Sequence, residues 1–150
     1  MKPSRKDWYV EEFTSISKGI RNKNHLSYED FLRVKNYKAQ ALSEAKKGQV
    51  MVQTKKAFEA AKQHKVEDAI KALTKLHGVG IATASAILAM WDPDKYAIVD
   101  KRVIKNLGVS FRKNPLKSAE GYKEYLRVMD KKRGNATLRD FERKVFEKED

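Results

Sequence analysis

The sequence predicts an all-α protein, and three features of the chain indicate this fold class. Apolar residues recur at helical spacing along most of the 150 residues, and no run of alternating β-branched residues suggests a strand. Glycine and proline are scarce, with 7 and 3 residues, so turns are few. Hydrophobic residues make up 41% of the chain, which argues against disorder. We therefore expect one compact domain, residues 1–150, of about eight helices.

The first half of the chain contains three expected helices. The first, from Trp8 to Gly19, carries its apolar residues on one stripe. The second follows Ser27, a residue type that caps helix N-termini, with acidic Asp30 at the third position, and it is expected to continue until Gly48. A weaker helix is expected over residues 51–64.

The second half contains five expected helices and one extended segment. Two helices, over residues 66–76 and 81–91, flank the sequence Gly78-Val79-Gly80. An extended apolar connector, residues 96–99, leads to a short helix over residues 100–107 that Gly108 terminates. Ser118 and Thr137 are expected to cap the last two helices.

Composition excludes several classes of protein. The chain has no cysteine, so it can form neither a disulfide, nor a cysteine-ligated zinc site, nor an iron–sulfur cluster. The basic N-terminus is not followed by an apolar run, so we expect neither a secretory signal nor a membrane span. These features predict a cytoplasmic protein, which we expect to be a monomer.

The formal net charge of +13 is unevenly distributed. Residues 1–65 carry a net +8 and residues 101–150 a net +7, whereas residues 66–100 carry a net −2. Basic flanks of this kind favour a polyanionic partner, because each phosphate contact releases counterions. Charge alone leaves two other interpretations open, a lysine-rich surface that aids solubility and an acidic membrane surface.

The segment around the paired glycines is a candidate phosphate-binding hairpin. Gly78 and Gly80 permit positive φ and a close approach of a ligand to the backbone. The helix that follows has free N–H groups at its start, which favour a phosphate oxygen. Val79 lies between the glycines, and His77 at the mouth of the turn is placed to touch a phosphate. An ordinary αα-hairpin with a glycine C-cap explains the same pattern.

Asp100 is the candidate catalytic residue, because it follows the apolar connector and opens a short helix. Asp is also among the best N-cap residues, and capping alone accounts for its position. The two roles are compatible, since a cap hydrogen bond holds the carboxylate in place. Lys101 and Arg102, directly after it, are candidate phosphate contacts, or else part of a solvated helix turn.

These residues resemble the helix-hairpin-helix DNA glycosylase superfamily, which includes endonuclease III, the adenine-mismatch glycosylase MutY and the 8-oxoguanine glycosylases. The resemblance covers residues 66–107, with Leu76-His77-Gly78-Val79-Gly80-Ile81-Ala82-Thr83-Ala84 followed by Val99-Asp100-Lys101-Arg102-Val103. It implies a two-lobed helical fold with Asp100 as the catalytic aspartate and the hairpin glycines as the phosphate grip. The implied reaction is base excision repair, in which a damaged or mismatched nucleotide of duplex DNA is flipped out and its N-glycosidic bond hydrolysed.

The chain departs from this family at several positions. Bifunctional members carry a nucleophilic lysine where this chain has Ala82, so the resemblance implies a monofunctional enzyme without a lyase step. His77 replaces the usual proline, and the cluster-binding cysteines are missing. We therefore expect no cofactor and no metal centre, with a monovalent cation at the hairpin left open. The chain is also short for the family, so we expect the second lobe of the cleft to be trimmed.

Two other functions remain open. The chain is then either a non-catalytic helix-hairpin-helix DNA-binding protein in which Asp100 is only a cap, or a helical interaction domain whose basic faces meet an acidic protein. Six aromatic residues are candidates for stacking on a flipped base, although their positions on apolar stripes favour core packing: Trp8, Tyr9, Phe13, Tyr28, Trp91 and Tyr96.

Overall fold

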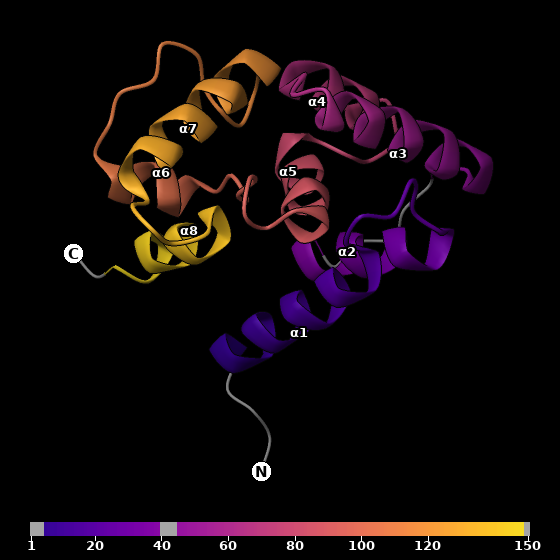
Figure 1. Cartoon of the computed structure of the whole chain (residues 1–150), viewed down its shortest axis with the longest axis horizontal. Coiled ribbons are helices and arrows are strands. Elements are labelled where there is room, and N and C mark those ends of the chain that lie inside the picture. Colours follow the sequence, from indigo (N-terminus) through magenta and orange to yellow (C-terminus); the bar gives the residue numbers. More distant parts are fainter. Residues whose placement is uncertain (1–4, 40–44, 149–150) are drawn as a thin grey trace.

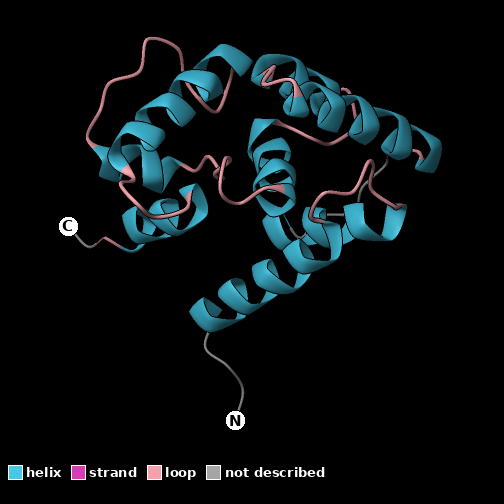
Figure 2. Ribbon diagram, viewed as in Figure 1, coloured by secondary structure: helices cyan, strands magenta, loops and turns pink. Residues whose placement is uncertain are grey.

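The computed structural model describes residues 5–39 and 45–148, and this part of the chain is built from helices (Figure 1). It contains eight helices and no strand, which confirms the predicted all-α class (Figure 2). The helices are α1 (Arg5–Ile20), α2 (Tyr28–Ala39), α3 (Lys47–Lys62), α4 (Val66–Thr74), α5 (Ile81–Trp91), α6 (Lys101–Leu107), α7 (Ala119–Lys132) and α8 (Leu138–Glu147).

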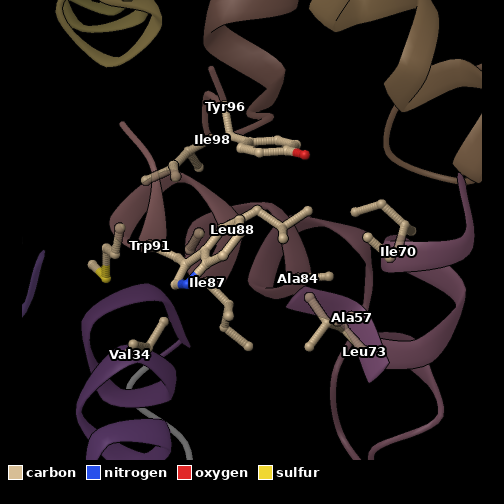
Figure 3. Close-up of a cluster of buried hydrophobic side chains, with 14 of the residues drawn as sticks. Val34, Ala57, Ile70, Leu73, Ala84, Ile87, Leu88, Trp91, Tyr96 and Ile98 are labelled. Atoms are coloured by element: carbon tan, nitrogen blue, oxygen red, sulfur yellow. The ribbon is translucent and has the colours of Figure 1, made fainter. Parts of the chain in front are cut away.

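Helix α5 is the central helix of the core. Its residues from Thr83 to Trp91 are all buried, and it packs against α1, α2 and α4. A helix that is apolar on every side needs this position, because any face left in water would expose apolar surface. Figure 3 shows side chains of α5 surrounded by Val34 of α2, Ala57 of α3, and Ile70 and Leu73 of α4. The sequence of small and apolar residues in α5 therefore determines which helices gather around it.

The C-terminal end of α5 is anchored by polar and aromatic contacts. The hydroxyl of buried Ser17 in α1 donates a hydrogen bond to the Met90 carbonyl at 2.6 Å. The Trp91 ring stacks on Phe58 of α3, with ring centroids 4.6 Å apart, and its indole N–H donates to the Lys23 carbonyl at 2.9 Å. These contacts fix α1, α3 and the loop after α1 to one end of the central helix.

The connector at residues 96–99 is buried and forms neither a helix nor a strand. It pairs with no strand, so its backbone groups need partners from side chains. Two carbonyls of the connector accept hydrogen bonds at 2.8 Å, Ala97 from the Tyr122 hydroxyl and Ile98 from the Tyr125 hydroxyl. Two of its N–H groups donate at 3.0 Å, that of Ile98 to a Glu142 oxygen and that of Val99 to the Ser85 hydroxyl. Helices α5, α7 and α8 thereby hold the connector in place.

Helices α6, α7 and α8 form a group on one side of this connector (Figure 1). Helix α8 packs against α6 and α7, and α7 also packs against α4. The predicted caps of this group are confirmed, since Ser118 accepts a hydrogen bond from Gly121 N–H and Thr137 accepts one from Asp140 N–H. Within the described residues, no helix is long and apolar enough to cross a membrane.

The boundary between α2 and α3 differs from the sequence-based expectation. Ser27 caps α2 as predicted, accepting a hydrogen bond from Asp30 N–H at 3.1 Å. The predicted continuation to Gly48 is wrong, because Ala45 and Lys46 are not helical and α3 begins at Lys47; residues 40–44 lie outside the described part of the chain. The start of α3 includes Gly48 because Val50 belongs to the buried stripe of that helix.

We expect Tyr125→Phe to destabilise the protein by about 1–2 kcal/mol, because it leaves the buried Ile98 carbonyl without a partner. Urea unfolding measures the change. Tyr28→Phe is the matched control, since it removes a hydroxyl from a half-buried ring, and we expect a change within about 0.5 kcal/mol. Equal stabilities of the two variants would show that the connector does not depend on this hydrogen bond.

Candidate nucleic-acid interface

The turn between α4 and α5, residues 75–80, is called the glycine turn below. Gly78 has φ +78°, a left-handed conformation that favours glycine. Gly80 is the N-cap of α5 in an extended conformation, and no side chain caps the helix. The first helical hydrogen bond of α5 runs from Ala84 N–H to the Gly80 carbonyl at 2.9 Å. The N–H groups of Ile81, Ala82 and Thr83 thus have no partner within the helix, an arrangement that suits an oxygen ligand.

A lysine from α2 reaches the glycine turn. The Lys35 ammonium donates a hydrogen bond to the Gly78 carbonyl at 2.5 Å, and Lys35 is only 6% exposed. A Cβ atom at position 78 would lie 3.4 Å from this ammonium nitrogen. Position 78 therefore suits glycine because of its positive φ, whereas the contact with Lys35 would be an ordinary one. The sequence analysis missed Lys35, because its spacing on α2 resembles that of any core-facing residue.

Asp100 is the N-cap of α6, as the sequence predicts. Its backbone is extended, with φ −149°, and one carboxylate oxygen accepts a hydrogen bond from Arg102 N–H at 2.7 Å. The other oxygen lies 3.6 Å from the Lys38 ammonium of α2, and the Asp100 side chain is 31% exposed. The carboxylate is held in a defined orientation and still reaches solvent.

Two sets of contacts link Asp100 indirectly to the glycine turn. The Ser85 hydroxyl donates to the Ala82 carbonyl at 2.7 Å in the first turn of α5 and accepts from Val99 N–H at 3.0 Å. The residue before Asp100 is thus bonded to the start of the helix that follows the turn. In addition, Lys35 and Lys38 are three residues apart and share one face of α2. One lysine contacts the turn and the other contacts Asp100.

Asp100 lies on the wall of a cleft of about 620 Å³ between α1 and α2 on one side and α6 and α8 on the other. Tyr9, Tyr37 and Lys38 line the first side, and Arg102 lines the second. The glycine turn lies outside this lining. Asp100 and its partner Lys38 thus line the cleft, whereas the glycine turn, which Lys35 contacts, does not.

A buried ion pair forms the floor of the cleft and was missed by sequence reasoning. Arg139 donates from one nitrogen to both carboxylate oxygens of Glu142, at 2.7 and 2.6 Å, and from another to the Tyr37 hydroxyl at 3.2 Å. Its guanidinium also lies 4.1 Å from the centroid of the Phe13 ring. The only sequence signal was opposite charge at i and i+3 in the last helix, a pattern common on exposed helix faces.

Burial raises the pKa of Glu142, and the Arg139 charge opposes this shift by favouring the carboxylate. For Arg139, burial lowers the pKa and is the largest single influence, but the attraction of Glu142 and Tyr37 and the hydrogen bonds to both together outweigh it, so the net pKa is raised. The two directions are consistent with a charged pair in which Glu142 bears the larger cost of leaving water. Glu142 also accepts a hydrogen bond from Ile98 N–H, so the ion pair connects α8 to the segment that precedes Asp100.

The other predicted binding residues occupy different environments. His77, Gly78 and Gly80 are exposed, whereas the Val79 side chain is buried, so Val79 can present only its backbone to a ligand. Lys101 is exposed in the first turn of α6. Arg102 is also exposed, with its guanidinium 4.8 Å from the centroid of the Phe146 ring.

The six aromatic candidates divide into core and cleft residues. Phe13, Trp91 and Tyr96 are buried, which fits the preference for core packing. Trp8, Tyr9 and Tyr28 are half-buried, and of these Tyr9 lines the cleft. Tyr37 joins this wall, with its ring centroid 5.4 Å from that of Tyr9 and 6.2 Å from that of Trp8. An aromatic wall thus stands in the same cleft as Asp100.

Comparisons with protein-family models, with curated proteins and with solved structures found no match to this chain. The function therefore has to be argued from the arrangement of the residues themselves.

We expect Glu142→Met to destabilise the protein by about 3–5 kcal/mol, because it leaves the Arg139 charge buried without a partner. The double variant Arg139→Met with Glu142→Met removes both charges, and we expect it to recover part of that loss, because Ile98 N–H still lacks its acceptor. Thermal or urea unfolding of both single variants and the double variant gives the coupling energy. Additive losses in the double variant would contradict a buried, coupled pair.

Proposed function

We propose that this protein binds duplex DNA and releases a damaged or mismatched base as a monofunctional N-glycosylase. The observation that carries the proposal is the position of Asp100. Its carboxylate is oriented by Arg102 N–H, faces a cleft with an aromatic wall, and is joined through Ser85 to the first turn of α5. A carboxylate beside a phosphate-binding element is the arrangement that sugar chemistry on DNA requires.

The glycine turn supports a sequence-independent grip on the DNA backbone. The start of α5 has no side-chain cap, and its N–H groups suit a phosphate oxygen. Exposed His77 and Lys101, at the turn and at the start of α6, add positive or hydrogen-bonding groups near it. Contacts of this kind position a strand without reading bases. The net charge of +13 favours the same partner.

The cleft supports the chemical step. In hydrolysis of the N-glycosidic bond, the base leaves and positive charge develops on the sugar, after which water adds to the anomeric carbon. Asp100 stabilises that charge and accepts a proton from the attacking water. The cleft volume of about 620 Å³ lies in the range of small-molecule sites. Half-buried Tyr9 lines the cleft and is the aromatic ring on which a flipped base can stack, with buried Tyr37 packed behind it.

One observation favours the alternative of a non-catalytic DNA-binding protein. Both Asp100 oxygens have partners, one in the cap hydrogen bond and the other near the Lys38 ammonium at 3.6 Å. These contacts are sufficient to account for an aspartate at this position. In the alternative, the glycine turn still binds DNA, and Asp100 serves only to begin α6.

Replacing Asp100 with Asn distinguishes the two functions. Asn also caps helices well, so the fold should persist while the charge is lost. We expect base release to fall at least about a hundredfold, with DNA affinity largely unchanged. The measurement is single-turnover release of free base from a panel of duplexes bearing different lesions and mismatches. Asp68→Asn, at an exposed position of α4, is the control with the same change of charge. Equal base release by the two variants would support the alternative.

Borohydride trapping on abasic DNA tests the absence of a lyase step. Ala82 has no amine, so we expect no covalent adduct from the position that bifunctional relatives of the proposed class use. Lys38 is the nearest alternative, since its ammonium lies 3.6 Å from Asp100. A trapped adduct would contradict the monofunctional proposal, and its loss in Lys38→Arg would assign the adduct to that side chain.

A further inference from the structure

Lys35 is one of two charged residues that are almost fully buried within the described part of the chain; the other is Glu142. Glu142 has the guanidinium of Arg139 as its partner. For Lys35, residues 5–39 and 45–148 provide one hydrogen-bond acceptor, the Gly78 carbonyl, and no carboxylate within ion-pair distance. A buried ammonium without a counter-ion is costly, and an anion arriving beside it relieves that cost.

The position of the ammonium indicates where such an anion would bind. It lies against Gly78, which places it at the corner of the glycine turn, two residues before the N-cap of α5. The N–H groups at the start of α5 have no side-chain cap. An ammonium has three N–H donors, and the Gly78 carbonyl uses one. The charge of Lys35 and the uncapped N-terminus of α5 both favour an anion such as a phosphate group at the turn.

We infer that Lys35 is a tethered cation of the glycine turn, which binds a DNA phosphate and takes the place of a free alkali ion at the Gly78 carbonyl. The inference rests on the proposed DNA binding and specifies how the turn achieves it. Backbone carbonyls are the ligands that K⁺ uses in proteins. Here an ammonium already donates to this carbonyl, so a phosphate meets a positive charge that belongs to the chain. DNA binding should then be indifferent to the kind of monovalent cation in solution.

The test measures the affinity of a short fluorescent duplex by anisotropy, for the wild type and three variants. Lys35→Met keeps the length of the side chain and removes the charge, whereas Lys35→Arg keeps the charge. Lys56→Met, at an exposed position of α3, is the matched control for loss of one positive charge. Each protein is titrated over a range of KCl concentrations, and the wild type also in tetramethylammonium chloride at equal ionic strength. Thermal unfolding of each variant shows whether it folds.

We expect the wild type to bind with equal affinity in the two salts. Lys35→Met should weaken binding by about tenfold or more, as expected for loss of a hydrogen bond from a charged group. It should also reduce the slope of log Kd against log salt by about 0.9, the contribution of one phosphate contact. Lys35→Arg should retain most of the affinity, and Lys56→Met should change it less than Lys35→Met does.

Two results would overturn the inference. One is a marked loss of wild-type affinity when tetramethylammonium replaces K⁺, which would show that a free alkali ion is needed. The other is wild-type affinity and salt slope in a folded Lys35→Met variant. If Lys35→Met does not fold, the wild-type salt comparison and Lys35→Arg decide the question. A wild type that binds no duplex even at low salt would instead refute the proposed function.

Discussion

The buried connector at residues 96–99 is the constraint on which the candidate site depends. This segment is not helical and no strand lies beside it in the described part of the chain, so each buried N–H and carbonyl group needs a partner of another kind, such as a side chain. Tyr122, Tyr125, Glu142 and Ser85 meet this requirement from three different helices. Asp100 follows the connector directly, so its position depends on the central helix α5 and on the neighbouring helices α7 and α8.

Helix α2 links the two parts of the proposed interface. Its buried face packs on α5, and successive lysines on the neighbouring face reach the glycine turn and Asp100. The arrangement concentrates positive charge beside a central segment, residues 66–100, whose own net charge is −2. A DNA strand lying along this face would meet positive groups from α2 as well as the N-terminus of α5. In the proposed function, the basic residues 1–65 and 101–150 therefore attract the DNA, and the nearly neutral residues 66–100 lie between them in the sequence.

The ion pair between Arg139 and Glu142 affects both the stability of the fold and the geometry of the cleft. The side chain of Glu142 is 5% exposed and that of Arg139 is 12% exposed. Removing either one therefore leaves the charge of the other in a poorly solvated position. Glu142 also holds the connector, and Arg139 contacts Tyr37 and Phe13 on the opposite wall. The pair therefore fastens α8 to the helices at the N-terminal end of the chain. A weaker apolar contact would leave the width of the cleft less well defined.

Local patterns in the sequence were sufficient to predict the all-α class, most helix positions, and the caps at Ser27, Asp100, Ser118 and Thr137, because these depend on residues a few positions apart. The same patterns failed at Gly48, where burial of Val50 extends α3 toward its N-terminus. Four residues could not be identified from the sequence: Lys35, Tyr37, Arg139 and Glu142. The partners of the first two lie 43 or more residues away, and the last two lie on a helix whose sequence looks solvent-exposed. Packing brings these groups together, and only the tertiary structure shows that a buried ammonium meets a glycine carbonyl.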